Sequence, residues 1–269
     1  MSLAHVVGYG ALGVVVGAFG TLIGAGGGFL LIPMLVFLHP HEPAANLTAI
    51  SLAVVCANSM SGSLAYARLG RIDVRSALLF SLAGLPGAIL GAWTTRAIDR
   101  RLFDPLLGAT LVLGAIAVLV RQRKPAPAAP GRVTRQVRER DGTLHVYSPR
   151  IGLGMLVSAG VGWLSSMLGI GGGILHVPAM VYLLGFPAHV ATATSHAVLA
   201  MLSLAAVVVH ATDGTLAPVL DRVLPIGAGA LLGAQIGARV STRVQGRWIL
   251  RGLALGLIVV GARLLLARH

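Results

Sequence analysis

The chain has 269 residues, of which 56% are hydrophobic and only 11% are charged, and its mean hydropathy is +0.86. A soluble domain carries about 25% charged residues, so this composition excludes an ordinary soluble fold and predicts an integral membrane protein. The formal net charge of +13 does not indicate a nucleic-acid-binding protein, because the basic residues lie in short loops between apolar stretches and not on one continuous face.

Ten apolar stretches follow one another along the chain. In order they cover residues 6–23, 29–38, 44–67, 76–97 and 102–120, then residues 151–168, 174–186, 190–209, 223–238 and 249–267. A helix needs roughly 20 mainly apolar residues to cross a bilayer, and most of the stretches approach that length. We therefore predict an all-α polytopic membrane protein with about ten helical segments, five in each half.

The two sets of stretches are separated by a segment that is rich in Pro, Ala and Arg and has no helical apolar period. Such a composition is typical of a solvated linker. The predicted domain organisation is a first five-helix repeat at residues 1–121, a basic cytoplasmic linker at residues 122–149 and a second five-helix repeat at residues 150–269.

The second stretch of each set begins with the same sequence pattern. Residues 24–34 (GAGGGFLLIPM) match residues 169–179 (GIGGGILHVPA), and residues 48–51 (TAIS) match residues 192–195 (TATS) at almost the same spacing. Self-similarity at a fixed spacing indicates an internal duplication. Further along, the aligned pairs are Gly87 with Gly233 and Gly91 with Gly237.

The basic residues predict how the chain is oriented. If every stretch crosses once and the N-terminus is outside, most of the 21 Lys and Arg residues lie on the cytoplasmic side, where such residues are enriched. Both termini are then outside. An odd number of crossings per copy inverts the second copy relative to the first, which is the plan of many secondary transporters. Whether the short second stretches span the bilayer or re-enter it stays open. If the first two stretches of each copy form a re-entrant hairpin, three crossings remain, which is still an odd number.

The short second stretches are also the predicted transport site. Each begins with a Gly-rich run and contains Pro33 or Pro178, and Gly/Pro-interrupted segments at corresponding positions of two halves are typical of such sites. Backbone polar groups cannot remain bare in hydrocarbon, so a break at membrane depth needs protein, water or a ligand to satisfy it. A helix that begins there presents free N–H groups and the positive end of its dipole, which together favour an anion.

Hydroxyl groups near the start of the third stretches and one histidine complete the predicted site. An alternative interpretation is structural, since Gly runs allow close helix packing, hydroxyls bond the carbonyl one turn back, and a buried histidine bonds a neighbouring helix. His196 is the preferred proton or substrate contact. The predicted substrate-binding residues are Gly26, Gly27, Gly28, Thr48, Ser51, Gly171, Gly172, Gly173, Thr192, Ser195 and His196.

The Asp and Glu residues all lie in loops or near the ends of the apolar stretches. Their positions argue against a cation site lined by carboxylates and favour an anion pathway. The sequence predicts no catalytic residue, cofactor or metal site. It predicts a small anion and membrane lipids as partners, no nucleic acid, and leaves a homo-oligomer open.

The duplicated Gly runs with Pro33 and Pro178, the TAIS and TATS segments, and residues 66–71 together resemble the TauE/SafE family of sulfite exporters. This resemblance implies a secondary transporter of the bacterial cytoplasmic (inner) membrane that exports sulfite or an organosulfonate such as sulfoacetate. Alternatives are a passive anion channel and an intramembrane enzyme that acts on a lipid phosphate. The enzyme is disfavoured, because such chemistry needs positioned acid, base or nucleophile groups.

Overall fold

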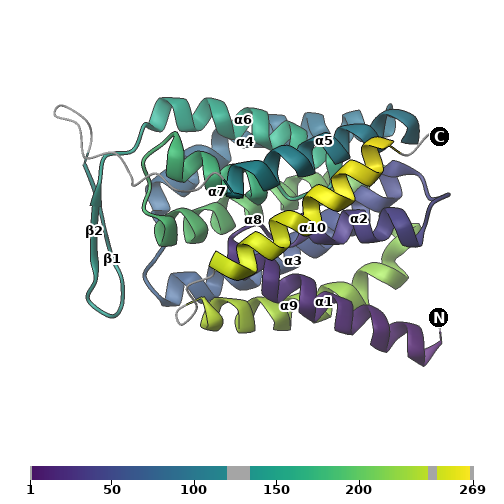
Figure 1. Ribbon diagram of the computed structural model, residues 1–269, viewed down its shortest axis with the longest axis horizontal. Coiled ribbons are helices and arrows are strands. Elements are labelled where there is room, and N and C mark those ends of the chain that lie inside the picture. The colour runs from purple at the N-terminus through teal and green to yellow at the C-terminus, as the bar shows by residue number, and fades with distance from the viewer. Residues whose placement is uncertain (1, 120–133, 242–246, 267–269) are drawn as a thin grey trace.

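The computed structural model describes residues 2–119, 134–241 and 247–266, which form ten α-helices, one short 3-10 turn and one β-hairpin (Figure 1). The elements, in order, are α1 (Leu3–Ile23), α2 (Gly28–Leu38), α3 (Ala44–Arg68), α4 (Val74–Arg96), α5 (Arg100–Leu119), β1 (Arg135–Arg138), β2 (Leu144–Tyr147), α6 (Ile151–Leu168), α7 (Gly173–Tyr182), α8 (Ala188–Thr212), η1 (Ala217–Val219), α9 (Leu220–Val240) and α10 (Arg247–Leu266).

Within this described part, six helical segments are long and apolar enough to cross a membrane: α1, α3, α4, α6, α8, and α9 together with η1. The protein is therefore a multi-pass membrane protein, and the predicted all-α class with about ten helical segments is confirmed. Helix α1 begins and α10 ends at the same end of the bundle, and the β-hairpin lies at the other end (Figure 1).

The helices of the two halves pack against each other in corresponding pairs. Helix α1 packs on α9, α4 on α6, α3 on α8 and α5 on α10. In two of these pairs a Cβ on any of the aligned glycines would collide with a carbonyl oxygen of the facing helix, so the backbones touch. The contacts are Gly87 with Ala159 and Gly91 with Trp163 in one pair, and Gly233 with Val14 and Gly237 with Ala18 in the other.

Glycines end the first helix of each half and begin the second. Helix α1 ends at Gly24 (φ 86°), α2 is capped by Gly27 (φ 85°), and α6 and α7 meet at Gly169 (φ 69°) and Gly172 (φ 66°). These left-handed conformations are accessible to glycine and strained for other residues. The second helices have only 11 and 10 residues, about 16 Å at 1.5 Å per residue, so neither spans a hydrocarbon core.

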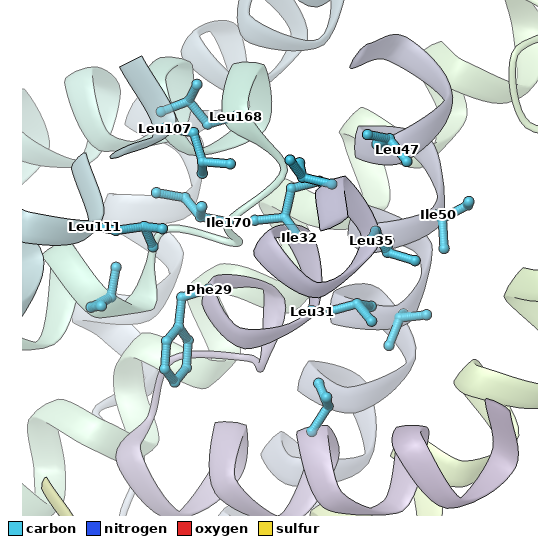
Figure 2. Packing of buried hydrophobic residues seen from close by; sticks show 14 of the residues in the cluster. Phe29, Leu31, Ile32, Leu35, Leu47, Ile50, Leu107, Leu111, Leu168 and Ile170 are labelled. Carbon is cyan, nitrogen blue, oxygen red and sulfur yellow. The ribbon is translucent and has the colours of Figure 1, made fainter. Parts of the chain in front are cut away.

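The short helix α2 buries one face inside the protein (Figure 2), while Met34, Phe37 and Leu38 are exposed. Its apolar side chains pack between α3, α5 and the break that follows α6, and the residues of this cluster are fully buried. The break that precedes α2, residues 24–28, is buried, which meets the requirement that an interrupted backbone be shielded from lipid. The labelled members are Phe29, Leu31, Ile32, Leu35, Leu47, Ile50, Leu107, Leu111, Leu168 and Ile170.

The antiparallel β1–β2 hairpin lies inside the predicted linker and was not anticipated from the sequence. It docks on the turn between α3 and α4. Arg71 Nε donates to Glu139 at 2.6 Å, and the Tyr147 hydroxyl donates to the Asp73 carboxylate at 2.8 Å. Burial and the neighbouring Asp73 raise the pKa of Tyr147. Residues 122–133 of the predicted linker, and its boundary with the first repeat, lie outside the described residues.

At the opposite end of the bundle, Glu42 joins the α2–α3 loop to α9. Its carboxylate accepts from Asn46 Nδ2 at 2.7 Å and from Arg222 Nη1 at 3.1 Å. The hydrogen bond from Asn46 and then the pairing with Arg222 outweigh partial burial and hold the pKa of Glu42 below its ordinary value.

A lowered carboxyl pKa stabilises the fold above the ordinary value of about 4.3, and this contribution is lost as the pH falls through the lowered pKa. We therefore expect the melting temperature of the wild type to drop more between pH 6 and about pH 3 than that of Glu42→Gln. Differential scanning fluorimetry measures both, with the exposed Asp99→Asn as control. Identical acid sensitivity of wild type and Glu42→Gln would contradict this expectation.

Candidate functional site

The two Gly-rich breaks contact each other through their backbones. A Cβ placed on Gly28 would lie 2.7 Å from the carbonyl carbon of Ile170 and 2.8 Å from the carbonyl oxygen of Gly169. In the reciprocal contact, a Cβ on Gly173 would lie 2.6 Å from the carbonyl oxygen of Gly24 and would overlap the Cα atom of Ala25. The structure thus brings the breaks of the two halves together.

Each break also touches the start of the third helix of the other half. A Cβ on Gly24 would lie 2.7 Å from Thr192 Cγ2, and one on Gly169 would lie 3.0 Å from Thr48 Cγ2. Ser51 Oγ donates to the carbonyl oxygen of Gly169 at 2.6 Å. Thr48, Ser51 and Thr192 therefore lie beside the breaks.

Val55 of α3 lies between the middle glycines of the two runs. A Cβ on Gly26 would lie 3.0 Å from Val55 Cγ1, and one on Gly171 would lie 2.7 Å from the same atom. These predicted site residues are therefore brought together around one apolar side chain.

The first amide groups of α2 and α7 retain unpaired donors. The N–H groups of Leu30 and Leu31 donate back to Gly27, but those of Gly28 and Phe29 donate to no acceptor in the described part of the chain. In α7 the Gly173 N–H donates to the Gly171 carbonyl at 2.8 Å, and Leu175 and His176 donate to Gly172, so among these first amides only that of Ile174 donates to no acceptor in the described part of the chain. Free N–H groups at a helix start carry the positive end of the dipole.

The four predicted hydroxyl groups differ in their partners. Thr48 Oγ1 donates to the carbonyls of Ala44 and Ala45 at 3.0 and 2.9 Å. This bond to the preceding turn is the structural role that hydroxyl groups often have in membrane helices. Thr192 is half-buried beside Gly24. Ser195 Oγ is fully buried and has no hydrogen-bond partner within the described residues. Its hydroxyl is therefore the one most available to a ligand.

His196 belongs to a buried polar cluster whose other members were not predicted as site residues. Its Nε2 lies 3.3 Å from Thr21 Oγ1, which in turn donates to Asn58 Oδ1 at 3.2 Å. The Tyr66 hydroxyl donates to the Thr21 carbonyl at 2.7 Å, and the Tyr66 ring meets the His196 ring edge to face. Gly62 leaves room for the histidine, since a Cβ there would lie 2.6 Å from His196 Cδ2.

This polar cluster has no counterpart in the other half. The aligned positions hold Leu52 in place of His196 and Leu202 in place of Asn58. Leu52 packs with Ala206 in an apolar cluster. The duplicated glycines therefore lie beside one polar and one apolar environment.

Two further histidines within the apolar helices lie apart from this cluster. His176 of α7 is buried against the Phe80 ring at a centroid distance of 6.0 Å, and His210 Nδ1 lies 3.0 Å from Thr215 Oγ1. Among the described residues, no group of three His, Cys, Asp or Glu side chains has a geometry that could hold a metal ion.

Comparison with known proteins gives matches that extend over most of the chain. The family model described as "Sulfite exporter TauE/SafE" matches residues 9–264. The "Probable membrane transporter protein YunE" of Bacillus subtilis (strain 168) is 30% identical over 261 residues, which cover 94% of this chain and 95% of that protein.

Two more distant relatives carry similar names. A "Probable membrane transporter protein" of Xylella fastidiosa is 30% identical over 190 residues, 69% of this chain and 65% of the relative. One from Methanocaldococcus jannaschii is 25% identical over 209 residues, 76% of this chain and 72% of the relative. No solved structure matches the chain.

Proposed function

Because the chain belongs to the TauE/SafE sulfite exporter family of membrane transporters, we propose that it exports a small sulfur oxyanion across the bacterial cytoplasmic membrane. The substrate class is sulfite or an organosulfonate such as sulfoacetate. The family is one of transporters, so the protein is a transporter and not an enzyme.

The observation that carries the anion proposal is the contact between the two Gly-rich breaks. It brings two helix starts with free N–H groups close to each other inside the protein. Backbone N–H groups and the positive ends of two helix dipoles favour a negative charge. The unpartnered Ser195 hydroxyl adds a donor of the kind that binds the oxygens of a sulfonate or sulfite group.

The packing of α3 against α8 supports two halves of opposite orientation. Tyr66, near the end of α3, lies beside His196, near the start of α8. Leu52, near the start of α3, packs with Ala206, near the end of α8. The two helices are thus antiparallel. In an inverted repeat the breaks approach the centre from opposite sides, and rocking of one half against the other exposes the site to each side in turn.

Reconstituted transport tests this proposal. The purified protein in liposomes is expected to release sulfite or sulfoacetate with a rate that saturates as the anion concentration rises, and to discriminate among sulfite, sulfoacetate, taurine, sulfate and thiosulfate. Conductance that does not saturate, resolved as single-channel currents, would instead support a passive channel. Indifference to all five compounds would refute the proposed substrate class.

Ser195→Ala is expected to weaken anion binding about 10- to 100-fold, because a hydrogen bond to a charged group contributes about 1.5–3 kcal/mol. The matched control is Ser203→Ala on the same helix. Ser203 is also buried, but its hydroxyl already donates to the Leu199 carbonyl at 2.6 Å. Isothermal titration with sulfoacetate gives both dissociation constants, and equal losses in the two variants would exclude a specific role for Ser195.

A further inference from the structure

We propose that His196 takes up a proton when the anion binds, so that the protein carries one proton together with its anion. This inference rests on the proposed function, since it needs an anion at the site beside the Gly-rich breaks. It goes beyond that function by naming the coupled ion and the residue that binds it.

The oxygens on the Nε2 side of the ring are arranged as acceptors. Thr21 Oγ1 donates its single hydrogen to Asn58 Oδ1 at 3.2 Å, so its lone pairs remain for Nε2 at 3.3 Å. A chain of two hydrogen bonds thus runs from a protonated Nε2 through the hydroxyl to the amide oxygen. All three side chains are fully buried, so water does not replace these partners.

The Nδ1 side of the ring also faces acceptors. The backbone carbonyls of Gly24 and Thr192 lie beside the ring, which is fully buried. Thr192 lies one helical turn before His196, so the nitrogen beside its carbonyl is Nδ1, and this atom forms no hydrogen bond of good geometry. Carbonyl oxygens have no hydrogen to offer, so Nδ1 can be satisfied here only as an N–H donor.

A neutral imidazole carries one hydrogen and therefore leaves one side of this arrangement unsatisfied. With the hydrogen on Nε2, the Nδ1 lone pair faces carbonyl oxygens. With the hydrogen on Nδ1, Nε2 competes with Asn58 for the Thr21 hydroxyl hydrogen. The imidazolium, which donates from both nitrogens, matches every partner when the Asn58 amide is oriented with Oδ1 toward Thr21.

No described carboxylate contacts His196 to balance the charge of an imidazolium. The titratable group against the ring is Tyr66, at a centroid distance of 5.6 Å. Asp73 reaches this region only through its backbone N–H, which donates to Thr194, while its carboxylate binds Ser76 and Tyr147.

Arg71, in the turn between α3 and α4, is paired with Glu139 and so does not add an unpaired charge near His196. A buried cation without a counter-ion is unfavourable, and so is a buried anion without one. Bound together they compensate each other, and the resulting coupling is reciprocal: the anion raises the affinity for the proton, and the proton raises the affinity for the anion. For a monovalent sulfonate the loaded complex has no net added charge, so the membrane potential exerts no force on it.

Proton uptake during anion binding tests this inference directly. The probes are methanesulfonate and sulfoacetate, titrated calorimetrically near pH 7 into the purified full-length protein in two buffers of different ionisation enthalpy. Methanesulfonate has no group that titrates near neutral pH, so any proton taken up with it is bound by the protein. We expect the wild type to take up about one proton per anion, and His196→Gln to take up none.

Two further variants keep the test decisive if His196→Gln does not fold. Thr21→Val removes the acceptor at Nε2, so proton uptake is expected to require a pH lower by about one unit. His210→Gln, a second buried histidine on α8, is expected to retain the uptake of the wild type.

Three results would overturn the inference. Wild-type binding without proton uptake would refute the coupling and leave the proposed function standing. Undiminished uptake by His196→Gln would assign the proton to another group. Failure of both sulfonates to bind the wild type would refute the organosulfonate proposal, and the coupling with it.

Discussion

Gly173→Ala is expected to destabilise the protein and to abolish anion transport, because the new methyl group overlaps the backbone of the opposite break. The neighbouring atoms are Ala25 Cα and the Gly24 carbonyl oxygen. Backbone atoms cannot rotate away as a side chain can, so the two breaks must separate. Overpacking costs about 1–3 kcal/mol where side chains can adjust, and a backbone neighbour places this variant at or above the upper end of that range.

Gly160→Ala on α6 is the matched control. No atom lies within 4 Å of the position that its Cβ would occupy. Alanine is favoured over glycine inside a helix by up to about 1 kcal/mol, so this variant is expected to melt no earlier than the wild type. Scanning fluorimetry and reconstituted sulfite flux are measured on both proteins. A Gly173→Ala protein with wild-type melting and transport would show that the two breaks are not in contact in the working transporter.

Asp73→Ala is expected to lower the free energy of unfolding by about 2–4 kcal/mol and to release the β-hairpin. Asp73 caps α4 by accepting from the Ser76 N–H at 3.1 Å, and it also accepts from the Tyr147 hydroxyl. Loss of an N-cap costs about 1 kcal/mol, and a buried hydroxyl left without an acceptor costs about 1–3 kcal/mol. Both losses occur in this one variant.

The hairpin is followed separately by limited proteolysis. Arg140 lies exposed in the hairpin turn, and its backbone N–H donates to the Leu69 carbonyl at 3.0 Å. Undocking breaks that bond, so tryptic cleavage after Arg140 is expected to become faster in Asp73→Ala. The control is Asp99→Ala, at an exposed position before α5, which leaves the scissile Arg140–Asp141 bond unchanged. Equal cleavage rates in the two variants would show that Asp73 does not hold the hairpin in place.

The parts of the candidate site that the sequence predicted are those that occur in both halves of the chain. The Gly runs specify breaks because six of their glycines, three in each run, adopt positive φ angles between the helices. Their duplication predicted two such elements, and in the structure the backbone of Gly28 contacts that of Gly169.

The parts that the sequence did not predict are those that occur once. Thr21, Asn58 and His196 are far apart along the chain, and leucines stand at the positions aligned with Asn58 and His196, so no duplicated pattern marks the three as one cluster. The β-hairpin was missed because its strands have only four residues each, too few for an alternating pattern to be recognised, and because its contacts with Asp73 and Arg71 are long-range.

The pairing of α1 with α9 bears on how the protein is assembled during synthesis. Gly13 and Gly17 of α1 fit against the Ile226 and Ala230 carbonyls of α9. This face of α1 therefore lacks its packing partner until α9, close to the end of the chain, has been synthesised. Transmembrane helices can insert singly and associate later, with small residues making the close contacts. The glycine face of α1 therefore stays exposed to lipid until α9 is inserted. A nascent chain arrested before residue 220 lacks α9, the helix that covers this face.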